Sequence, residues 1–239
     1  MSTVNRFTME DVRLFWDGVA EEYVRENERV GWVHTQRFKE GLRRVALKPG
    51  IRVLNVWSRA GGAIPYVRQT CGGVRLVSAE LSHAMLKHAR ARFPDELFVQ
   101  TGLHELPFAA ASFDVVLSFE TLEHVPNPGA FLGEIRRVII DGGTLVMSLP
   151  PSTAEWTSML NRVCRFHHGE GPHRFMSPRE VKALLADSRF HCTSQQGTLY
   201  LPVGAALFES LDAALSRALG EGPLAQLGLR QFYVCKASG

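Results

Sequence analysis

The sequence predicts a doubly wound α/β sheet, and three observations support this fold class. Short apolar runs recur along residues 51–150, and they are typical of strands that are buried on both faces of a parallel sheet. Stretches with helical spacing separate these runs, and such alternation indicates an α/β fold. The chain has 239 residues, 45% of them hydrophobic, which is enough to build one large core.

A helical segment is expected before the first strand. Between Met9 and Leu47 apolar residues return at helical spacing, most regularly from Val12 to Val24. Pro49 and Gly50 then end the helical pattern. Residues 1–48 are therefore expected to form an N-terminal helical part of the fold.

Five buried strands are expected in the next hundred residues. They are IRVLNV (51–56), VRLVSAEL (74–81), ELFVQ (96–100), SFDVVLSF (112–119) and GGTLVMSLP (142–150). Helices are predicted over residues 82–93 and from Pro128 to about Ile140. Asn127 supplies an N-cap and Pro128 a first-turn proline, which together fix where the second helix begins.

Residues 151–180 are expected to form a cap or loop over the site. Their stretch NRVCRFHHGEGPHRFMSP is rich in Gly, His, Arg and Pro. A helix over 178–188, a run over 190–201, a helix from about 204 to 219 and a last strand over 229–237 follow. The chain is thus expected to form one domain, 1–239, in which residues 181–239 complete the sheet.

Composition argues against several classes of protein. A net charge of +3 comes from 27 basic and 24 acidic residues without a basic block, so nucleic acid is not an expected partner. No stretch approaches the roughly 20 apolar residues of a membrane helix, and the start resembles no signal peptide, so a cytoplasmic protein is expected. The cysteines form no CxxC pair and are expected to be free thiols: Cys71, Cys164, Cys192 and Cys235.

A ligand is expected at the loops after the first, second and fourth strands, because ligands of α/β sheets bind beyond the strands' carboxyl ends. The first loop offers only Gly61 and Gly62 and no GxGxxG motif, so a dinucleotide enzyme is not expected. Glu80 ends the second strand about 20 residues later, where a carboxylate binds ribose hydroxyls. This placement indicates a ribose-bearing ligand, and the alternative is a helix-capping acid.

Four segments together carry a family resemblance: IRVLNVWSRAGG, LVSAELSHAMLKHARAR, HRFMSPREVKALL, and the block from LHELPF through FDVVLSFETLEHVPNPGAFLGEIRRV to GGTLVMSLPP. The chain resembles the class I S-adenosylmethionine-dependent methyltransferases over most of residues 10–200. It is most similar to the small-molecule branch that includes ubiquinone and menaquinone biosynthesis methyltransferases. The resemblance implies a Rossmann-like, mostly parallel sheet with an antiparallel last strand, a cofactor-binding core at 49–150 and an N-terminal lid.

The resemblance also implies the residues that bind S-adenosylmethionine. They follow the family's motifs after the first four strands, and Tyr23 matches a lid position that often lines the cofactor. The implied set is Tyr23, Asn55, Trp57, Ser58, Gly61, Glu80, Leu81, Gly102, Leu103 and Phe119.

Several positions depart from the family pattern. Asn55 stands for an aspartate, Trp57 and Arg59 stand for two glycines, and Gly102 stands for an aspartate that binds adenine. Bulky side chains at glycine positions fill volume that the methionine part of the cofactor uses. Either the pocket is blocked, or Trp57 turns against the N-terminal helix and Arg59 meets the cofactor's carboxylate.

The pattern E-x-x-E-H after the fourth strand holds Glu120, Glu123 and His124. With His173 these side chains are candidate ligands for a divalent cation such as Mg²⁺ or Zn²⁺, which would hold the acceptor oxygen. The alternative is that His124 acts without metal, as a general base assisted by Glu120 or as a packing residue.

The cap contributes further aromatic and imidazole side chains. His167 and His168 are interpreted as solvated or substrate-facing. Phe166 and Phe175 suit an aromatic or lipid-like substrate, although core packing explains them equally well.

The predicted function is methylation of an oxygen or carbon of a small molecule, with an altered cofactor pocket. The first alternative is an inactive homologue that serves as a structural or regulatory subunit of an active methyltransferase. The second is a protein that uses the pocket for chemistry other than methyl transfer. A homodimer and a heteromer with an active relative are both compatible with the sequence.

Overall fold

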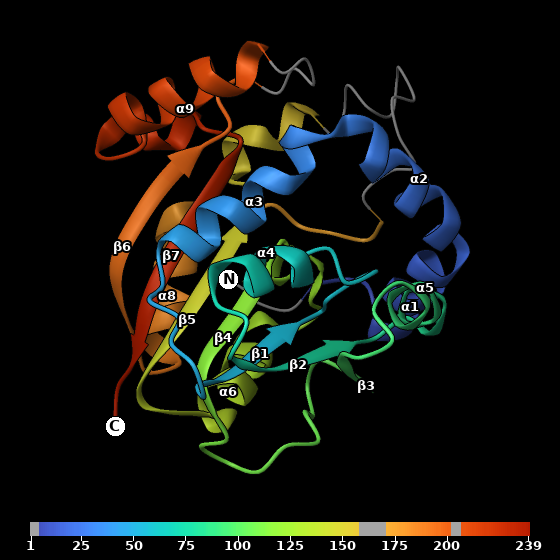
Figure 1. The fold of residues 1–239 in the computed structure, drawn as a ribbon. Coiled ribbons are helices and arrows are strands. Elements are labelled where there is room, and N and C mark those ends of the chain that lie inside the picture. Colours follow the sequence, from blue (N-terminus) through green and yellow to red (C-terminus); the bar gives the residue numbers. More distant parts are fainter. Residues whose placement is uncertain (1–4, 158–170, 202–206) are drawn as a thin grey trace.

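The computed structural model describes residues 5–157, 171–201 and 207–239. These residues contain a seven-stranded sheet in the order β3-β2-β1-β4-β5-β7-β6 (Figure 1). Its strands are β1 (Arg52–Val56), β2 (Arg75–Glu80), β3 (Leu97–Gln100), β4 (Phe113–Phe119), β5 (Ile139–Leu149), β6 (Phe190–Thr198) and β7 (Arg230–Ala237).

The direction of the strands agrees with the predicted fold class. β1 to β5 run parallel, whereas β7 is antiparallel to both of its neighbours, β5 and β6. The prediction of a mostly parallel Rossmann-like sheet with an antiparallel last strand is therefore confirmed. The strand order changes direction between β1 and β4, so a ligand site is expected at their carboxyl ends.

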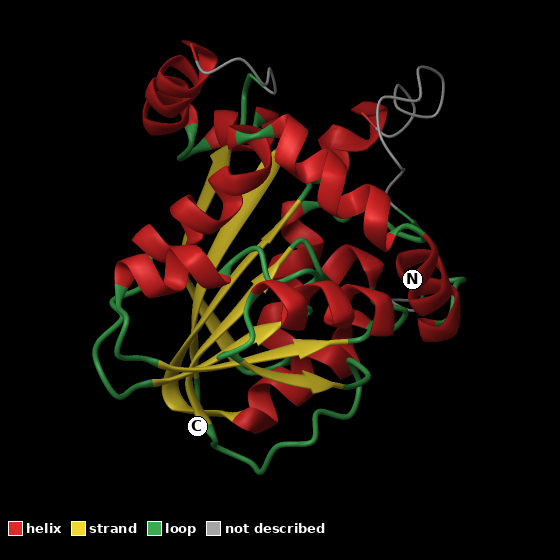
Figure 2. Ribbon diagram, turned by 45° about the vertical axis from the view of Figure 1, so that its right-hand side comes forward, coloured by secondary structure: helices red, strands yellow, loops and turns green. Residues whose placement is uncertain are grey.

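Helices lie around the sheet (Figure 2). They are α1 (Met9–Gly18), α2 (Ala20–Val30), α3 (Trp32–Arg43), α4 (Ile64–Thr70), α5 (His83–Arg92), α6 (Pro128–Val138), α8 (Pro178–Asp187) and α9 (Leu207–Leu219). Short 3₁₀ turns occur at η1 (Leu122–His124), η2 (Ser152–Ala154) and η3 (Pro223–Leu227).

Neighbouring residues of the central strands enter two different hydrophobic cores. Val53 belongs to a core with side chains of α3 and α4, whereas Leu54 belongs to a core with side chains of α1, α5, α6 and α8. Successive side chains of a strand point to opposite faces of its sheet. Both faces are thus covered, which explains why these strands read as continuous apolar runs.

The predicted N-terminal helical segment forms three helices, with breaks at Val19 and Gly31. Gly31 has a φ of 57°, which glycine adopts without strain. α3 approaches the sheet closely at Gly41, where a Cβ atom would lie 2.2 Å from the ring of Phe119. A glycine is therefore required there, and α3 is held directly above the end of β4.

β5 begins at Ile139, three residues before the predicted start at Gly142. Ile139 pairs with Phe113 and Thr144 pairs with Val115, so the residues between them form an irregularity in the ladder. Gly142 has a φ of 73°, which permits this irregular path. The pairing of Ile139 with Phe113 could not be predicted from the sequence, because Gly142 and Gly143 separate Ile139 from the apolar run that follows them.

Parts of the predicted cap, 151–157 and 171–180, lie among the described residues. Pro151 bridges to Met176, and the Ser152 amide donates to the Met176 carbonyl at 3.0 Å. The two ends of the predicted cap are therefore held together beside β5. Phe166, His167 and His168 lie outside the described residues.

Asn127 caps α6 as predicted, since its side-chain oxygen accepts from the Ala130 amide at 3.1 Å. We expect Asn127→Ala to lower the free energy of unfolding by about 1 kcal/mol, because an amide at the helix start loses its acceptor. Urea denaturation measures the change. Gln226→Ala, at an exposed side chain, is the control and should stay within about 0.5 kcal/mol of the wild type.

Candidate functional site

The loops after β1, β2 and β4 meet at the carboxyl end of the sheet. The Ser58 amide donates to the Ala79 carbonyl at 2.9 Å, which joins the β1 loop to the end of β2. The Glu120 amide donates to the Ser148 carbonyl at 2.7 Å, which joins the end of β4 to β5. These bonds fix the backbone on which the candidate side chains stand.

The β1 loop has a backbone path that suits glycine but carries two large side chains. The φ angles are 52° at Trp57, 53° at Arg59 and 79° at Gly61. Glycine enters this left-handed region freely, whereas other residues are strained by roughly 1–2 kcal/mol. Trp57 and Arg59 therefore stand in conformations that are typical of glycine.

Glu80, at the end of β2, is fully buried. One carboxylate oxygen accepts from the Arg59 amide at 2.6 Å, and the other accepts from the Ser82 amide at 2.8 Å. Burial raises the pKa of Glu80 to about 7, although the charge of Arg59 and the amide bonds act in the opposite direction. The chain's own atoms thus fill the space beside this carboxylate.

The guanidinium of Arg59 packs against two indole rings, whose planes meet at 83°. It stands 3.5 Å from the ring centre of Trp57 and 4.1 Å from that of Trp16 on α1. Its Nη2 donates to the Glu120 carbonyl at 3.1 Å. Burial lowers the pKa of Arg59, and the guanidinium is held by aromatic faces and one carbonyl. We call this arrangement of Trp16, Arg59 and Trp57 the arginine stack.

The arginine stack continues into the predicted catalytic residue. His124 is buried and packs edge-on against Trp57 at 5.2 Å and against Trp16 at 5.7 Å between ring centres. Trp16 also packs edge-on against Tyr23 at 5.5 Å. The indole of α1 therefore contacts both the predicted lid residue and the predicted base.

Glu120 binds two buried arginines from distant parts of the chain. One oxygen accepts from Nη1 of Arg37 on α3, and the other accepts from Nε of Arg230 on β7 at 2.6 Å. Arg37 also donates to the Tyr23 hydroxyl at 3.0 Å, and Arg230 donates to the Gln36 side chain at 2.6 Å. Burial alone would raise the pKa of Glu120, but Arg230 and Arg37 outweigh it and hold that pKa well below its ordinary value.

His124 is fixed in one tautomer. Its Nδ1 lies 2.9 Å from the Pro172 carbonyl, which only accepts, so Nδ1 carries the proton and Nε2 carries the lone pair. Burial, followed by the positive charge of Arg59, lowers the pKa of His124 well below its ordinary value. The imidazole is therefore neutral near pH 7. Nε2 lies 3.8 Å from a Glu123 oxygen, which is too far for a hydrogen bond.

The predicted metal site is not supported. No group of three or more His, Cys, Asp or Glu side chains in the described part of the chain is arranged to hold a metal ion. Glu120 is turned toward Arg37 and Arg230, and the Nδ1 of His173 lies 2.7 Å from the Gly171 carbonyl. A carboxylate that already faces two guanidinium groups offers little attraction for a cation.

The other predicted cofactor residues differ in their surroundings. Asn55, Ser58, Leu81 and Leu103 are buried near the strand ends, whereas Gly102 is exposed. Phe119 does not point into the site. Its ring packs edge-on against Phe38 at 5.6 Å, in the core on the other face of the sheet.

Sequence reasoning did not single out Trp16, Arg37 or Arg230. Trp16 lies in the stretch of helix-spaced apolar residues from Val12 to Val24, and this spacing indicates packing and not a site. For Arg230 a signal exists, since a charged residue at the head of an apolar final strand needs a buried partner. Arg37 lies among polar helix residues, so nothing in its spacing marks it.

The sequence comparison matches one segment of the chain to a known family. Residues 56–147 match the methyltransferase domain family, and this segment includes the β1 loop, Glu80 and His124. The match covers less than half of the chain, which over this segment resembles S-adenosylmethionine-dependent methyltransferases. Its sheet, with the ligand loops at the carboxyl ends of β1, β2 and β4, is the expected framework for that family.

Two curated relatives illustrate the branch. Demethylmenaquinone methyltransferase of Renibacterium salmoninarum is 33% identical over 141 residues, which cover 58% of this chain and 58% of that protein. A phthiotriol/phenolphthiotriol dimycocerosates methyltransferase of Mycobacterium ulcerans is 36% identical over 116 residues, which cover 46% of this chain and 45% of that protein. The chain thus spans about half the length of these relatives.

A solved structure extends the likeness to the whole fold. The [4+2]-cyclase SpnF matches with a TM-score of 0.72 over 99% of both chains, at 14% identity. At this identity the match shows the fold alone. In the described residues no helix has the length and apolar character needed to cross a membrane.

The bonds of Glu120 lead to a stability prediction. Glu120→Gln leaves the buried Arg37 and Arg230 without a counter-charge, so the free energy of unfolding should fall by about 3–5 kcal/mol. Urea denaturation measures it. Glu10→Gln, which removes an exposed pair with Arg13, is the control and should change the free energy of unfolding far less. A loss for Glu120→Gln as small as the control's would contradict the assignment.

Glu80 leads to a prediction about pH. Its folded pKa of about 7 exceeds the ordinary 4.5, so folding is penalised as pH rises from 4.5 to 7 and the penalty stays constant above that range. Glu80→Gln carries no such penalty. Between pH 5 and pH 8 the unfolding free energy of this variant should therefore gain about 2–3 kcal/mol relative to the wild type. The exposed Glu105→Gln should show no gain, and an equal pH profile for wild type and Glu80→Gln would refute the raised pKa.

Proposed function

We propose that the protein is an S-adenosylmethionine-dependent methyltransferase for a small acceptor molecule, and that its site opens before the cofactor binds. One observation supports this most strongly. Glu80 stands at the carboxyl end of β2, beside a β1 loop whose backbone has the left-handed turns of a glycine loop. Both features lie in the segment that matches the methyltransferase family.

The polar groups of the site fit the cofactor. Glu80 would accept hydrogen bonds from the ribose hydroxyls, and Arg59 would bind the carboxylate of the methionine part. Asn55 Nδ2 and Arg59 Nη1 are buried donors that lack a hydrogen-bond partner among the described residues. An anionic ligand group would satisfy such donors, since an unsatisfied buried donor costs about 1–3 kcal/mol.

Space for the cofactor requires the arginine stack to open. Arg59 must leave its place between Trp16 and Trp57, and α1 must move with Trp16. Each cation–π contact contributes roughly 0.5–2 kcal/mol, so the closed form is favoured to a moderate degree. Affinity is reduced by the fraction of molecules that are closed, tenfold for each 1.4 kcal/mol.

Bound S-adenosylmethionine supplies an electrophilic methyl group on a sulfonium. The chain's part is to accept a proton from the acceptor, and the Nε2 lone pair of His124 is the group for this role. Because burial makes His124 a weak base, it suits an acidic hydroxyl such as a phenol better than an alcohol. Glu120 would position α3 and β7 rather than move a proton, since two arginines keep it charged.

An aromatic or lipid-like acceptor is consistent with the surroundings of His124. Phe175 packs edge-on against His173 at 5.0 Å, and the His173 ring lies 5.9 Å from that of His124. This gives an aromatic wall on the side away from the arginine stack. The names of the relatives, a demethylmenaquinone and a phenolphthiotriol methyltransferase, support the same class of acceptor.

The arginine stack also favours a second function. If Trp57 and Arg59 never leave the site, Glu80 stays buried and the chain is an inactive homologue. Such a protein would serve as a structural or regulatory subunit of an active methyltransferase. The two large side chains of the β1 loop support this alternative, because both are buried and fill volume beside Glu80 that a glycine loop leaves open.

Titration calorimetry with S-adenosylmethionine and S-adenosylhomocysteine separates the two functions. The methyltransferase proposal expects the wild type to bind both ligands. Glu80→Ala should then weaken binding by about 2–4 kcal/mol, since each charged hydrogen bond contributes about 1.5–3 kcal/mol. Glu105→Ala is the matched control and should bind like the wild type.

The alternative expects the opposite result. The wild type would then show no binding at millimolar ligand, whereas a variant that restores the family pattern would bind: Asn55→Asp, Trp57→Gly, Arg59→Gly and Gly102→Asp. This result would overturn the methyltransferase proposal. Wild-type binding that the restored variant does not improve would overturn the inactive-homologue alternative.

A further inference from the structure

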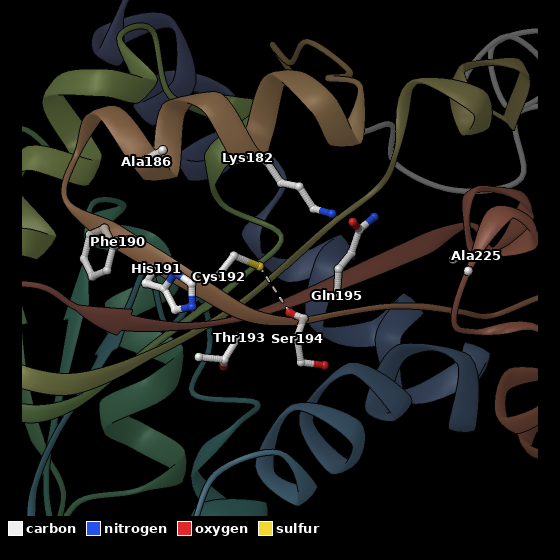
Figure 3. Close-up of a pocket in the computed structure, with 10 residues that line it drawn as sticks. Lys182, Ala186, Phe190, His191, Cys192, Thr193, Ser194, Gln195 and Ala225 are labelled. Atoms are coloured by element: carbon white, nitrogen blue, oxygen red, sulfur yellow. Dashed lines mark hydrogen bonds between the residues drawn. The ribbon is translucent and has the colours of Figure 1, made fainter.

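A cavity of about 540 Å³ lies away from the cofactor site, where α8 crosses the edge strand β6 (Figure 3). Its lining includes Lys182 and Ala186 from α8, residues of β6, and Ala225 from η3. Cys192 lines the cavity, and its sulfur points toward the Ser194 carbonyl at 3.4 Å. The cavity thus gives small reagents access to a thiol.

A second thiol lies directly across the strand pair. Cys192 on β6 is opposite Cys235 on β7 in the antiparallel register. Both side chains are on the face that packs against the core with α8. Cys192 is partly exposed whereas Cys235 is fully buried, and neither is in a disulfide. The two cysteines therefore form a pair with one accessible member and one protected member.

The spacing of opposite residues suits a disulfide. In an antiparallel pair, opposite Cα atoms are about 4.5 or 5.5 Å apart, and disulfides join Cα atoms about 4.4–6.8 Å apart. The register shifts just after Cys192, where the extra residue Thr193 donates its hydroxyl to the Val234 carbonyl at 3.0 Å. The shift leaves the Cys192–Cys235 pairing itself intact.

The electrostatic surroundings favour the thiolate of Cys192. A hydrogen bond from the Cys235 thiol and then the charge of Lys182 lower the pKa of Cys192 to about 7, against the effect of burial. The same hydrogen bond and burial raise the pKa of Cys235. Since the thiolate is the reactive form, Cys192 is the nucleophile of the pair.

We propose that Cys192 and Cys235 form an oxidation-sensitive dithiol, in which hydroperoxides reach Cys192 through the cavity beside α8. The Cys192 thiolate attacks one peroxide oxygen, the O–O bond breaks, and a sulfenic acid forms as hydroxide leaves and is protonated to water. The Cys235 sulfur, on losing its proton, then attacks the Cys192 sulfur, the S–S bond forms as the S–O bond breaks, and the hydroxide that leaves takes up a proton to give a second water. One peroxide is reduced and two thiols are oxidised.

The test uses full-length protein with Cys71→Ser and Cys164→Ser, in which only Cys192 and Cys235 remain. After treatment with one equivalent of hydrogen peroxide, thiols are counted with a chromogenic disulfide under denaturing conditions, and the intact mass is measured. We expect both thiols to disappear and the mass of the single chain to fall by two hydrogen atoms, with no mass of two disulfide-linked chains. Retention of both thiols overturns the proposal.

Single replacements in the same background assign the roles. Cys235→Ser should stop at a Cys192 sulfenic acid, which dimedone traps. Cys192→Ser should leave Cys235 reduced, because it is buried. Oxidation of Cys235 at an unchanged rate in Cys192→Ser would show an independent thiol and overturn the pairing.

A pH profile tests whether Cys235 influences the reactivity of Cys192. The rate at which iodoacetamide alkylates Cys192 should rise with an inflection near pH 7 when Cys235 is present. In Cys235→Ser the inflection for Cys192 should move, because a serine hydroxyl replaces the Cys235 thiol as the hydrogen-bond donor to Cys192. An inflection at the ordinary value for a thiol in the Cys235-containing protein contradicts the proposal.

Discussion

The bonds of Glu120 connect the parts of the molecule that surround the candidate site. Its carboxylate holds Arg37 from α3 and Arg230 from β7, and its carbonyl accepts from Arg59 in the β1 loop. These three arginines come from α3, the last strand and the first loop, and each is less than a tenth exposed. Buried guanidinium groups are stable only where acceptors neutralise them. The closed arrangement of the site therefore depends on this one residue at the end of β4.

The need of buried cations for acceptors also explains the contacts of Arg59 in the closed site. Arg59 lies between indole faces, while its backbone amide binds Glu80. Glu80 and Arg59 thus compensate part of each other's burial, and removal of either exposes the other to an unfavourable environment. A ligand that carries both a diol and a carboxylate would replace these contacts by equivalent ones. Under the proposed function, closure and ligand binding are therefore alternatives that use the same groups.

Much of the fold follows from the sequence, because apolar strands and helix spacing are local signals. The cap at Asn127 and the antiparallel last strand agree with prediction, and the start of β5 differs because the irregular pairing at Gly142 is not a local signal. At the site, motif position placed Glu80 at the end of β2 and His124 in the turn after β4, and the structure has them there. It did not reveal that Glu120 faces two arginines, since these partners lie 83 and 110 residues away in the chain.

The predicted metal site also shows that local spacing cannot reveal long-range partners. Spacing within E-x-x-E-H allows a shared ligand set, but spacing carries no information about what else surrounds each carboxylate. Phe119 is a comparable case, because alternation along β4 decides which face it joins, and Gly41 on α3 leaves room for its ring there. Long-range partners, rather than local pattern, determine the role of these residues.

The arginine stack gives the closed site an optical signature. Trp16 and Trp57 are almost fully buried, with a cation between their rings, whereas Trp156 is more than half exposed to solvent. Indole emission responds to the polarity and charge around the ring. When Arg59 moves out, as the proposed function requires, Trp16 and Trp57 lose a neighbouring charge at the same time. The emission of these two indoles would therefore report the proposed opening, above the contribution of Trp32 and Trp156.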